Sequence, residues 1–141
     1  AREMALMIVR DGEGVTRVAE GRVEGARDAA EADRIARAVA ESLLVKTALH
    51  GGDPNWGRIL AAVGRAGVPV DDRRVDIHLG DVWVAEGGSA RDYPEERARA
   101  ALVEEDPVRI RIHLNAGSAS SWMLTSDISK AYVDINASYR S

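Results

Sequence analysis

The chain has 141 residues, of which 45% are hydrophobic and 30% charged, and its formal net charge is −4 at pH 7. This composition excludes a disordered chain, and no apolar run approaches the roughly 20 residues that a membrane-spanning helix needs. The sequence contains no cysteine, which excludes disulfides, thiolate metal sites and a cysteine nucleophile. We therefore expect a cytoplasmic protein that binds neither nucleic acid nor membrane.

The first half of the chain alternates between helix and strand patterns. Ile35, Val39 and Leu43 recur every four residues, which is typical of a helix that packs on one side. Asp53 followed by Pro54 predicts an N-cap and the first position of another helix. The expected elements are a helix over 1–10, a strand over 16–24, a helix over 26–44, a short strand over 43–49 and a helix over 54–65.

The second half favours strands joined by tight turns. Gly80 and Asp81 supply a turn between two apolar segments, which indicates a hairpin. The expected elements are strands over 74–79 and 82–85, a helix from Asp92, Pro94 and Glu95 to about 104, an alternating strand over 108–114, its hairpin partner over 119–125, and a helix capped by Asp127 that ends near Asn136. This order predicts an α+β fold around a mixed or mostly antiparallel sheet.

The beginning of the chain is unusual. Ala1 opens a segment typical of the middle of a helix, with no methionine and no capping residue before it. Residues 1–141 are therefore expected to be a single domain or part of one, cut from a longer protein. No linker, low-complexity tract or internal repeat divides them.

Two common catalytic arrangements lack support in the sequence. His50, His78 and His113 lie far apart and form no H-x-x-x-H or H-E-x-x-H pair, so no metal site is expected. The serines around Ser118 and Ser120 occupy a strand-like segment without a G-x-S-x-G motif. Structural roles are the better interpretation for these residues.

Three segments carry groups that can bind a small polar ligand. Asp11 and Glu13 form a glycine-flanked carboxylate pair that suits a cationic amine, although such a turn is also a common solvated connection. Near the other end, Asn136 and the Ser141 hydroxyl belong to a tail whose composition favours a fixed position. Residues 53–58 either present an anion site in a first helical turn or form a capped helix whose Trp packs on the sheet.

Three motifs in a fixed order carry a resemblance to a known family. They are Ile8-Val9-Arg10-Asp11-Gly12-Glu13-Gly14, the stretch 44–48 with 53–64, and the stretch 125–129 with 131–133 and 135–141. Together they resemble the ornithine acetyltransferase family, the bifunctional glutamate N-acetyltransferases of arginine biosynthesis. The resemblance covers nearly the whole chain.

The resemblance implies a layered helix/sheet sandwich, α-β-β-α-like, with mixed and antiparallel strands, of which this chain is one part. It also implies a precursor that cleaves itself into two chains, so that the new N-terminal threonine of the second chain becomes the nucleophile. This threonine takes the acetyl group from N-acetylornithine and passes it to glutamate. A Thr-Gly pair on the first chain stabilises the oxyanion, and no cofactor is implied.

The same resemblance places this chain at the C-terminal part of the second, beta chain. The nucleophile and oxyanion donors then lie on the companion alpha chain and the upstream beta-chain segment, and no catalytic residue lies in this chain. By motif position, Glu13, Asn136 and Ser141 match the family's substrate-binding residues. Ser141 stands where threonine is more usual, which keeps the hydroxyl.

Two other interpretations compete with an acetyltransferase part. One is a non-enzymatic amino-acid-binding α+β regulatory module, which would tolerate loss of the residues after Val133. The other is a structural fragment with no ligand contacts of its own, for which replacement of Glu13 would have no effect.

Overall fold

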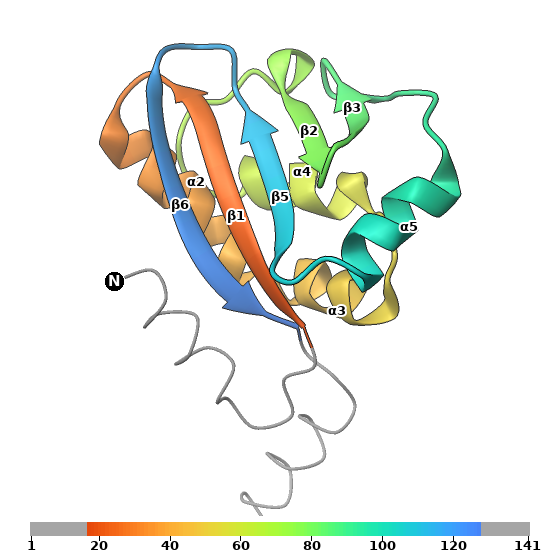
Figure 1. Cartoon of the computed structure of the whole chain (residues 1–141). Coiled ribbons are helices and arrows are strands. Elements are labelled where there is room, and N and C mark those ends of the chain that lie inside the picture. The colour runs from red at the N-terminus through yellow and green to blue at the C-terminus, as the bar shows by residue number, and fades with distance from the viewer. Residues whose placement is uncertain (1–16, 128–141) are drawn as a thin grey trace, which may run out of the picture.

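The computed structural model describes residues 17–127, and these residues form one mixed sheet of six strands with helices against it (Figure 1). The strand order is β4-β3-β2-β5-β1-β6. The strands are β1 (Val18–Ala26), β2 (Asp76–Leu79), β3 (Val82–Glu86), β4 (Ser89–Ala90), β5 (Val108–His113) and β6 (Ala119–Ser126). The helices are α2 (Ala29–Glu41), α3 (Leu43–Gly51), α4 (Trp56–Gly64) and α5 (Glu95–Val103), with a 3₁₀ turn over Asp72–Arg74.

These elements confirm the predicted α+β class with a mixed sheet. The helices expected over 1–10 and from Asp127 to Asn136 involve residues outside the described range. The described residues contribute one sheet and its helices to the layered architecture that the resemblance implies. Within the described residues, no helix is long and apolar enough to cross a membrane.

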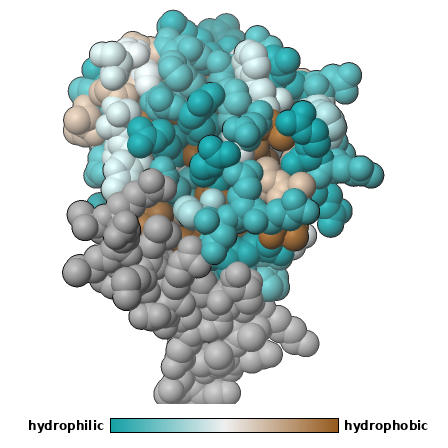
Figure 2. All heavy atoms as spheres, viewed as in Figure 1, coloured by the Kyte–Doolittle hydropathy of each residue, from teal (hydrophilic) through white to brown (hydrophobic). Residues whose placement is uncertain are grey.

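The two faces of the sheet differ in polarity because the strands alternate. Val23 of β1, Ile112 of β5 and Ile77 of β2 lie side by side in register on the buried face, and each is at most 1% exposed. Glu24 and Arg111, one residue away on β1 and β5, lie on the opposite face and form an ion pair of 3.4 Å. Helices α2 and α4 lie behind the sheet in Figure 1, and the face toward the viewer is largely hydrophilic in Figure 2.

The predicted hairpin between 108–114 and 119–125 is wrong. Strand β6 pairs antiparallel with β1, and β1 pairs parallel with β5, so β1 lies between the two expected partners. The connection after β5 crosses over the end of β1, where the backbone N–H groups of Ala116 and Gly117 both donate to the Gly25 carbonyl at 2.8 Å. A parallel pair needs a long crossover, which the helices between β1 and β5 provide.

The short strand expected over 43–49 is also wrong, because this segment is helix α3. Ser42 separates α2 from α3, and its hydroxyl accepts a hydrogen bond from the Val45 backbone N–H at 3.3 Å. Val45, Ala48 and Leu49 are buried, a spacing that places them on one side of a helix. The predicted helix over 26–44 therefore ends at Glu41, and a second helix begins at once.

The N-cap of α4 is Asn55, and the prediction of Asp53 as the cap is wrong. The Asn55 side-chain oxygen accepts from the Arg58 backbone N–H at 3.1 Å, and the helix begins at Trp56. Asp53 is exposed and accepts from the Asn55 side-chain amide at 3.2 Å. Asp53 therefore supports the capping residue from two positions before it.

This geometry predicts unequal effects of two alanine substitutions. Asn55→Ala removes the acceptor for the Arg58 backbone N–H and should lower the free energy of unfolding by about 1 kcal/mol. Asp53→Ala should change it by less than about 0.5 kcal/mol, because the residue is exposed and caps no backbone donor. Thermal unfolding followed by circular dichroism measures both, and an equal loss for the two variants would return the cap to Asp53.

Candidate functional site

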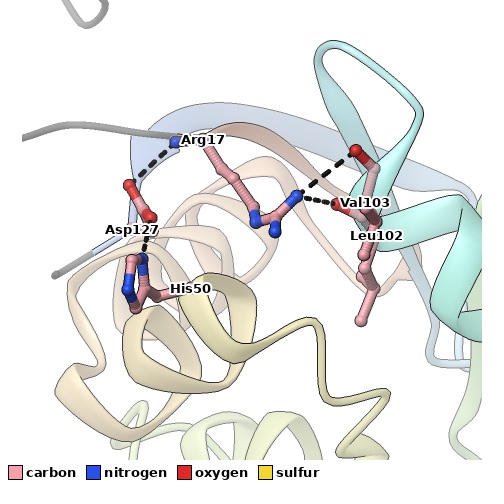
Figure 3. A network of polar contacts seen from close by, with 5 residues as sticks. All are labelled: Arg17, His50, Leu102, Val103 and Asp127. Atoms are coloured by element: carbon pink, nitrogen blue, oxygen red, sulfur yellow. Dashed lines mark hydrogen bonds and ion pairs between the residues drawn. The ribbon is translucent and has the colours of Figure 1, made fainter.

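The three substrate-binding residues expected from the resemblance, Glu13, Asn136 and Ser141, lie outside the described residues. The structure does describe the two positions from which the chain continues toward them, directly before β1 and directly after β6. Arg17 is the first described residue and stands directly before β1, while Asp127 is the last and directly follows β6. The two residues contact each other at one corner of the sheet (Figure 3).

Asp127 is the centre of this corner. Its carboxylate is 0% exposed. One carboxylate oxygen accepts from the Arg17 backbone N–H at 2.9 Å, and the other lies 2.9 Å from His50 Nδ1. The Asp127 backbone N–H also donates to the Arg17 carbonyl at 3.0 Å. Because a buried carboxylate is costly without hydrogen bonds, these contacts are required to keep Asp127 inside.

Local structure explains how these residues meet. The antiparallel register pairs Val18 with Ser126, so Arg17 and Asp127 are the next pair beyond the ends of β1 and β6. His50 lies in the last turn of α3, and the helix ends with Gly52 in the left-handed conformation. This last turn brings the His50 imidazole into contact with the buried Asp127 carboxylate. The His50 side chain is 41% exposed.

Arg17 also joins the corner to α5. Its Nη1 donates to the backbone carbonyls of Leu102 and Val103 at 3.2 and 3.3 Å (Figure 3). These carbonyls belong to the last residues of α5, where helical carbonyls lack intrahelical partners and a cation is favourable. The corner therefore brings together the ends of β1, β6, α3 and α5.

We name Arg17, His50 and Asp127 the corner network. The sequence did not predict this network: no metal site was expected at His50, and Asp127 was expected to cap a helix. The network depends on contacts between residues 110 and 77 positions apart in the chain. No local pattern in one sequence carries a signal for such pairs.

The other two histidines have different surroundings. His78 stacks on Trp83 with ring centroids 5.3 Å apart, and Arg91 lies over the same indole. Burial lowers the pKa of His78, and the positive charge of Arg111 acts in the same direction. His113 Nδ1 accepts from the Asn115 backbone N–H at 3.1 Å. Among residues 17–127, no group of three or more His, Asp or Glu side chains is placed to hold a metal ion.

The segment 53–58 joins two helices. Arg58 Nη1 donates to the Leu44 carbonyl at 3.1 Å and to Thr47 Oγ1 at 3.2 Å, and both acceptors belong to α3. Trp56 is partly buried and packs against the hydrophobic core. These contacts favour the packing interpretation of this segment over an anion site.

Comparisons with known proteins point to one family. The model of the ArgJ family matches residues 1–141. The arginine biosynthesis bifunctional protein ArgJ of Desulfotalea psychrophila is 49% identical over 139 residues, which is 99% of this chain and 35% of that protein. The protein of the same name from Brucella melitensis is 45% identical over 140 residues, which is 99% of this chain and 34% of that protein.

A solved structure agrees with these matches. The crystal structure of arginine biosynthesis bifunctional protein argJ from Bacillus halodurans matches with a TM-score of 0.93 and 39% sequence identity. The match covers 97% of this chain and 64% of that chain. The chain spans about a third of the length of the curated relatives it matches.

Proposed function

Because the chain belongs to the ArgJ family, we propose that residues 1–141 are the C-terminal part of an acetyltransferase that moves an acetyl group from N-acetylornithine to glutamate. The observation that carries the proposal is the match to the argJ structure of Bacillus halodurans over 97% of this chain. At 39% identity and a TM-score of 0.93, the similarity extends over the fold and the sequence together.

The proposed chemistry is a two-step acyl transfer on a threonine outside this chain. The threonine hydroxyl attacks the acetyl carbonyl, the C–N bond breaks, and ornithine leaves with the proton on its amine. The amine of glutamate then attacks the acyl-enzyme ester and releases N-acetylglutamate and the free threonine. Both steps form an oxyanion that needs preorganised donors. The companion alpha chain and the upstream segment of the beta chain are the partners that supply the nucleophilic threonine and the oxyanion donors.

This chain is proposed to supply substrate contacts through Glu13, Asn136 and Ser141. A carboxylate suits the ammonium group of ornithine, and an amide and a hydroxyl suit amino-acid groups through hydrogen bonds. Glu13 lies four residues before Arg17, and Asn136 lies nine residues after Asp127, so short stretches of chain join both to residues that contact each other in the corner network.

The test uses the complete enzyme. Intact-mass analysis of an active sample should show companion polypeptides, one of which begins with threonine, and the sample should convert N-acetylornithine and glutamate into ornithine and N-acetylglutamate. Ending the chain after Val133 should then cripple turnover, because Asn136 and Ser141 are lost. A lone species of 15.2 kDa in an active sample would contradict the two-chain account. Absence of acetyl transfer by the complete enzyme would contradict the proposed function itself.

A further inference from the structure

We propose that the groove between α2 and α4 binds a compact anion that carries two or more negative groups, phosphate or carboxylate. We name this feature the arginine groove. It is a hollow of about 670 Å³, and its lining includes Arg34 and Arg37 of α2, Leu43 at the start of α3, Ala62 of α4, and Arg65 directly after α4. The inference goes beyond the proposed function and does not depend on it.

Regular helix spacing brings the arginines of α2 to the groove. Arg34, Arg37 and Ala38 stand at positions i, i+3 and i+4 of α2, so they lie on one side of that helix. Helices α2 and α4 pack on each other behind the sheet (Figure 1). Each helix also contributes an alanine to the lining, Ala38 and Ala62. Because an alanine side chain ends at Cβ, space remains between the longer arginine side chains.

The lining carries an excess of positive charge. It contains three arginines and one carboxylate, Glu41, whereas the whole chain has a formal net charge of −4. Arg37 lies 3.9 Å from Glu41 and 3.9 Å from Asp33, and such long contacts between exposed side chains contribute little. Within residues 17–127, the side chains of Arg34 and Arg65 form no hydrogen bond or ion pair. Their guanidinium groups are therefore available to an anion.

The Arg34 guanidinium reaches across the groove. Its Nη2 lies 3.1 Å from the position that a Cβ on Gly67 would occupy, so the side chain extends from α2 to the turn that follows α4. Gly67 has a φ of 77°, a left-handed conformation that favours glycine. Arg65 stands two residues before Gly67 in the same turn. The two available arginines therefore come from different elements and meet at one end of the groove.

These features fit a small anion better than a neutral ligand. Guanidinium groups bind phosphate and carboxylate through paired, parallel hydrogen bonds. Positive side chains that line one groove repel one another, and a bound anion with two or more negative groups removes that repulsion. The volume of about 670 Å³ lies within the range of roughly 300–1,000 Å³ that is typical of small-molecule sites. Leu43, which is 65% exposed, provides an apolar wall for the carbon skeleton of such a ligand.

Isothermal titration of the complete enzyme with pyrophosphate, in a metal-free buffer of low ionic strength, tests the inference. Pyrophosphate carries several negative charges and contains neither a carboxylate nor an amine, so it differs from both substrates of the proposed reaction. We expect one site per copy of this chain. Arg34→Gln and Arg65→Gln should each weaken binding about tenfold, the scale of one lost hydrogen bond between charged groups. A parallel titration with succinate distinguishes phosphate from carboxylate, and binding of either anion that depends on Arg34 and Arg65 supports the inference.

Arg99 provides the matched control, because it is an exposed arginine of α5 outside the groove lining. Arg99→Gln removes the same charge and should leave the dissociation constant within about twofold of that of the unmodified enzyme. Arg34 and Arg65 are exposed as well, so all three variants should fold with the melting temperature of the unmodified enzyme. Equal weakening by the three substitutions would overturn the inference, because binding would then follow the overall charge.

Two further results would also overturn it. One is the absence of binding by both anions, which would leave the groove to an acidic polypeptide segment. The other is displacement of pyrophosphate by saturating glutamate or N-acetylornithine, which would assign the binding to the substrate site. The titration does not require acetyl transfer. An enzyme that binds pyrophosphate through Arg34 and Arg65 but transfers no acetyl group would therefore contradict only the proposed function.

Discussion

Replacing Ile112 by alanine should lower the free energy of unfolding by about 3–4 kcal/mol. Ile112 is 0% exposed and lies on β5, between Val23 of β1 and Ile77 of β2. The substitution removes buried apolar atoms and leaves a cavity between strands that pair on both sides and cannot close around it. A fall in the thermal unfolding midpoint, followed by circular dichroism, measures the effect.

The neighbouring residue provides the control. Arg111 lies on the opposite face of β5, is 50% exposed in its side chain and pairs with Glu24 at 3.4 Å. Exposed ion pairs contribute little, so Arg111→Ala should cost no more than about 1 kcal/mol. If the two variants lost the same stability, the assignment of a buried and a solvent face to β5 would be wrong.

These two neighbours illustrate which part of the fold the sequence predicts well. The alternation over 108–114 predicts one buried face, and the four residues that share that face, Val108, Ile110, Ile112 and Leu114, are all buried. The turn at Gly80 and Asp81 predicted the hairpin of β2 and β3, which pair antiparallel. In both cases the signal lies within one segment, because burial of one strand face and a tight turn are local requirements.

Strand neighbours were harder to predict, because pairing is decided between distant segments. The sequence between β5 and β6 is short enough for a hairpin, yet β1 lies between them. The connection is accommodated by Asn115, whose φ is 54°, and by the bonds of Ala116 and Gly117 to the Gly25 carbonyl. Strand β6 therefore pairs with β1 in place of β5.

The error at 43–49 has a different cause. The run Leu43-Leu44-Val45 is apolar enough for a short strand, and short apolar runs do not distinguish helix from strand. Leu43 and Leu44 are 65% and 47% exposed, whereas Val45 is 2% exposed. The segment is a helix because Ser42 caps it and one side packs into the core, and neither feature is visible from hydrophobicity alone.

The candidate site, like the fold, could be predicted from the sequence only in part. The resemblance supplied Glu13, Asn136 and Ser141 from their places in ordered motifs, whereas the corner network follows from contacts across the fold. His50 and Asp127 were both visible in the sequence, but their 2.9 Å contact joins the end of a helix to the end of a strand. The ordered motifs therefore led to the proposed substrate contacts, whereas tertiary structure was needed to find the corner network.

Replacing Glu13 by alanine in the complete enzyme should lower kcat/KM for N-acetylornithine about ten- to a hundredfold. This range corresponds to the loss of about 1.5–3 kcal/mol for a hydrogen bond between a carboxylate and an ammonium group. The effect should appear in the first half-reaction, measured as the rate at which ornithine is released, because the cationic amine belongs to the donor. Glu13→Gln should be intermediate, since the amide still accepts a hydrogen bond but carries no charge.

Asp11 is the matched control, because it carries the same charge two residues away in the same glycine-containing segment. Asp11→Ala changes the net charge of the segment by the same amount and should leave ornithine release within about twofold. Equal losses for the two variants would show that the segment acts through its overall charge. No loss for Glu13→Ala would favour the structural-fragment interpretation, in which all substrate contacts lie on other polypeptides. A selective loss at Glu13 requires a specific pairing, because long-range charge effects cannot distinguish two carboxylates so close together.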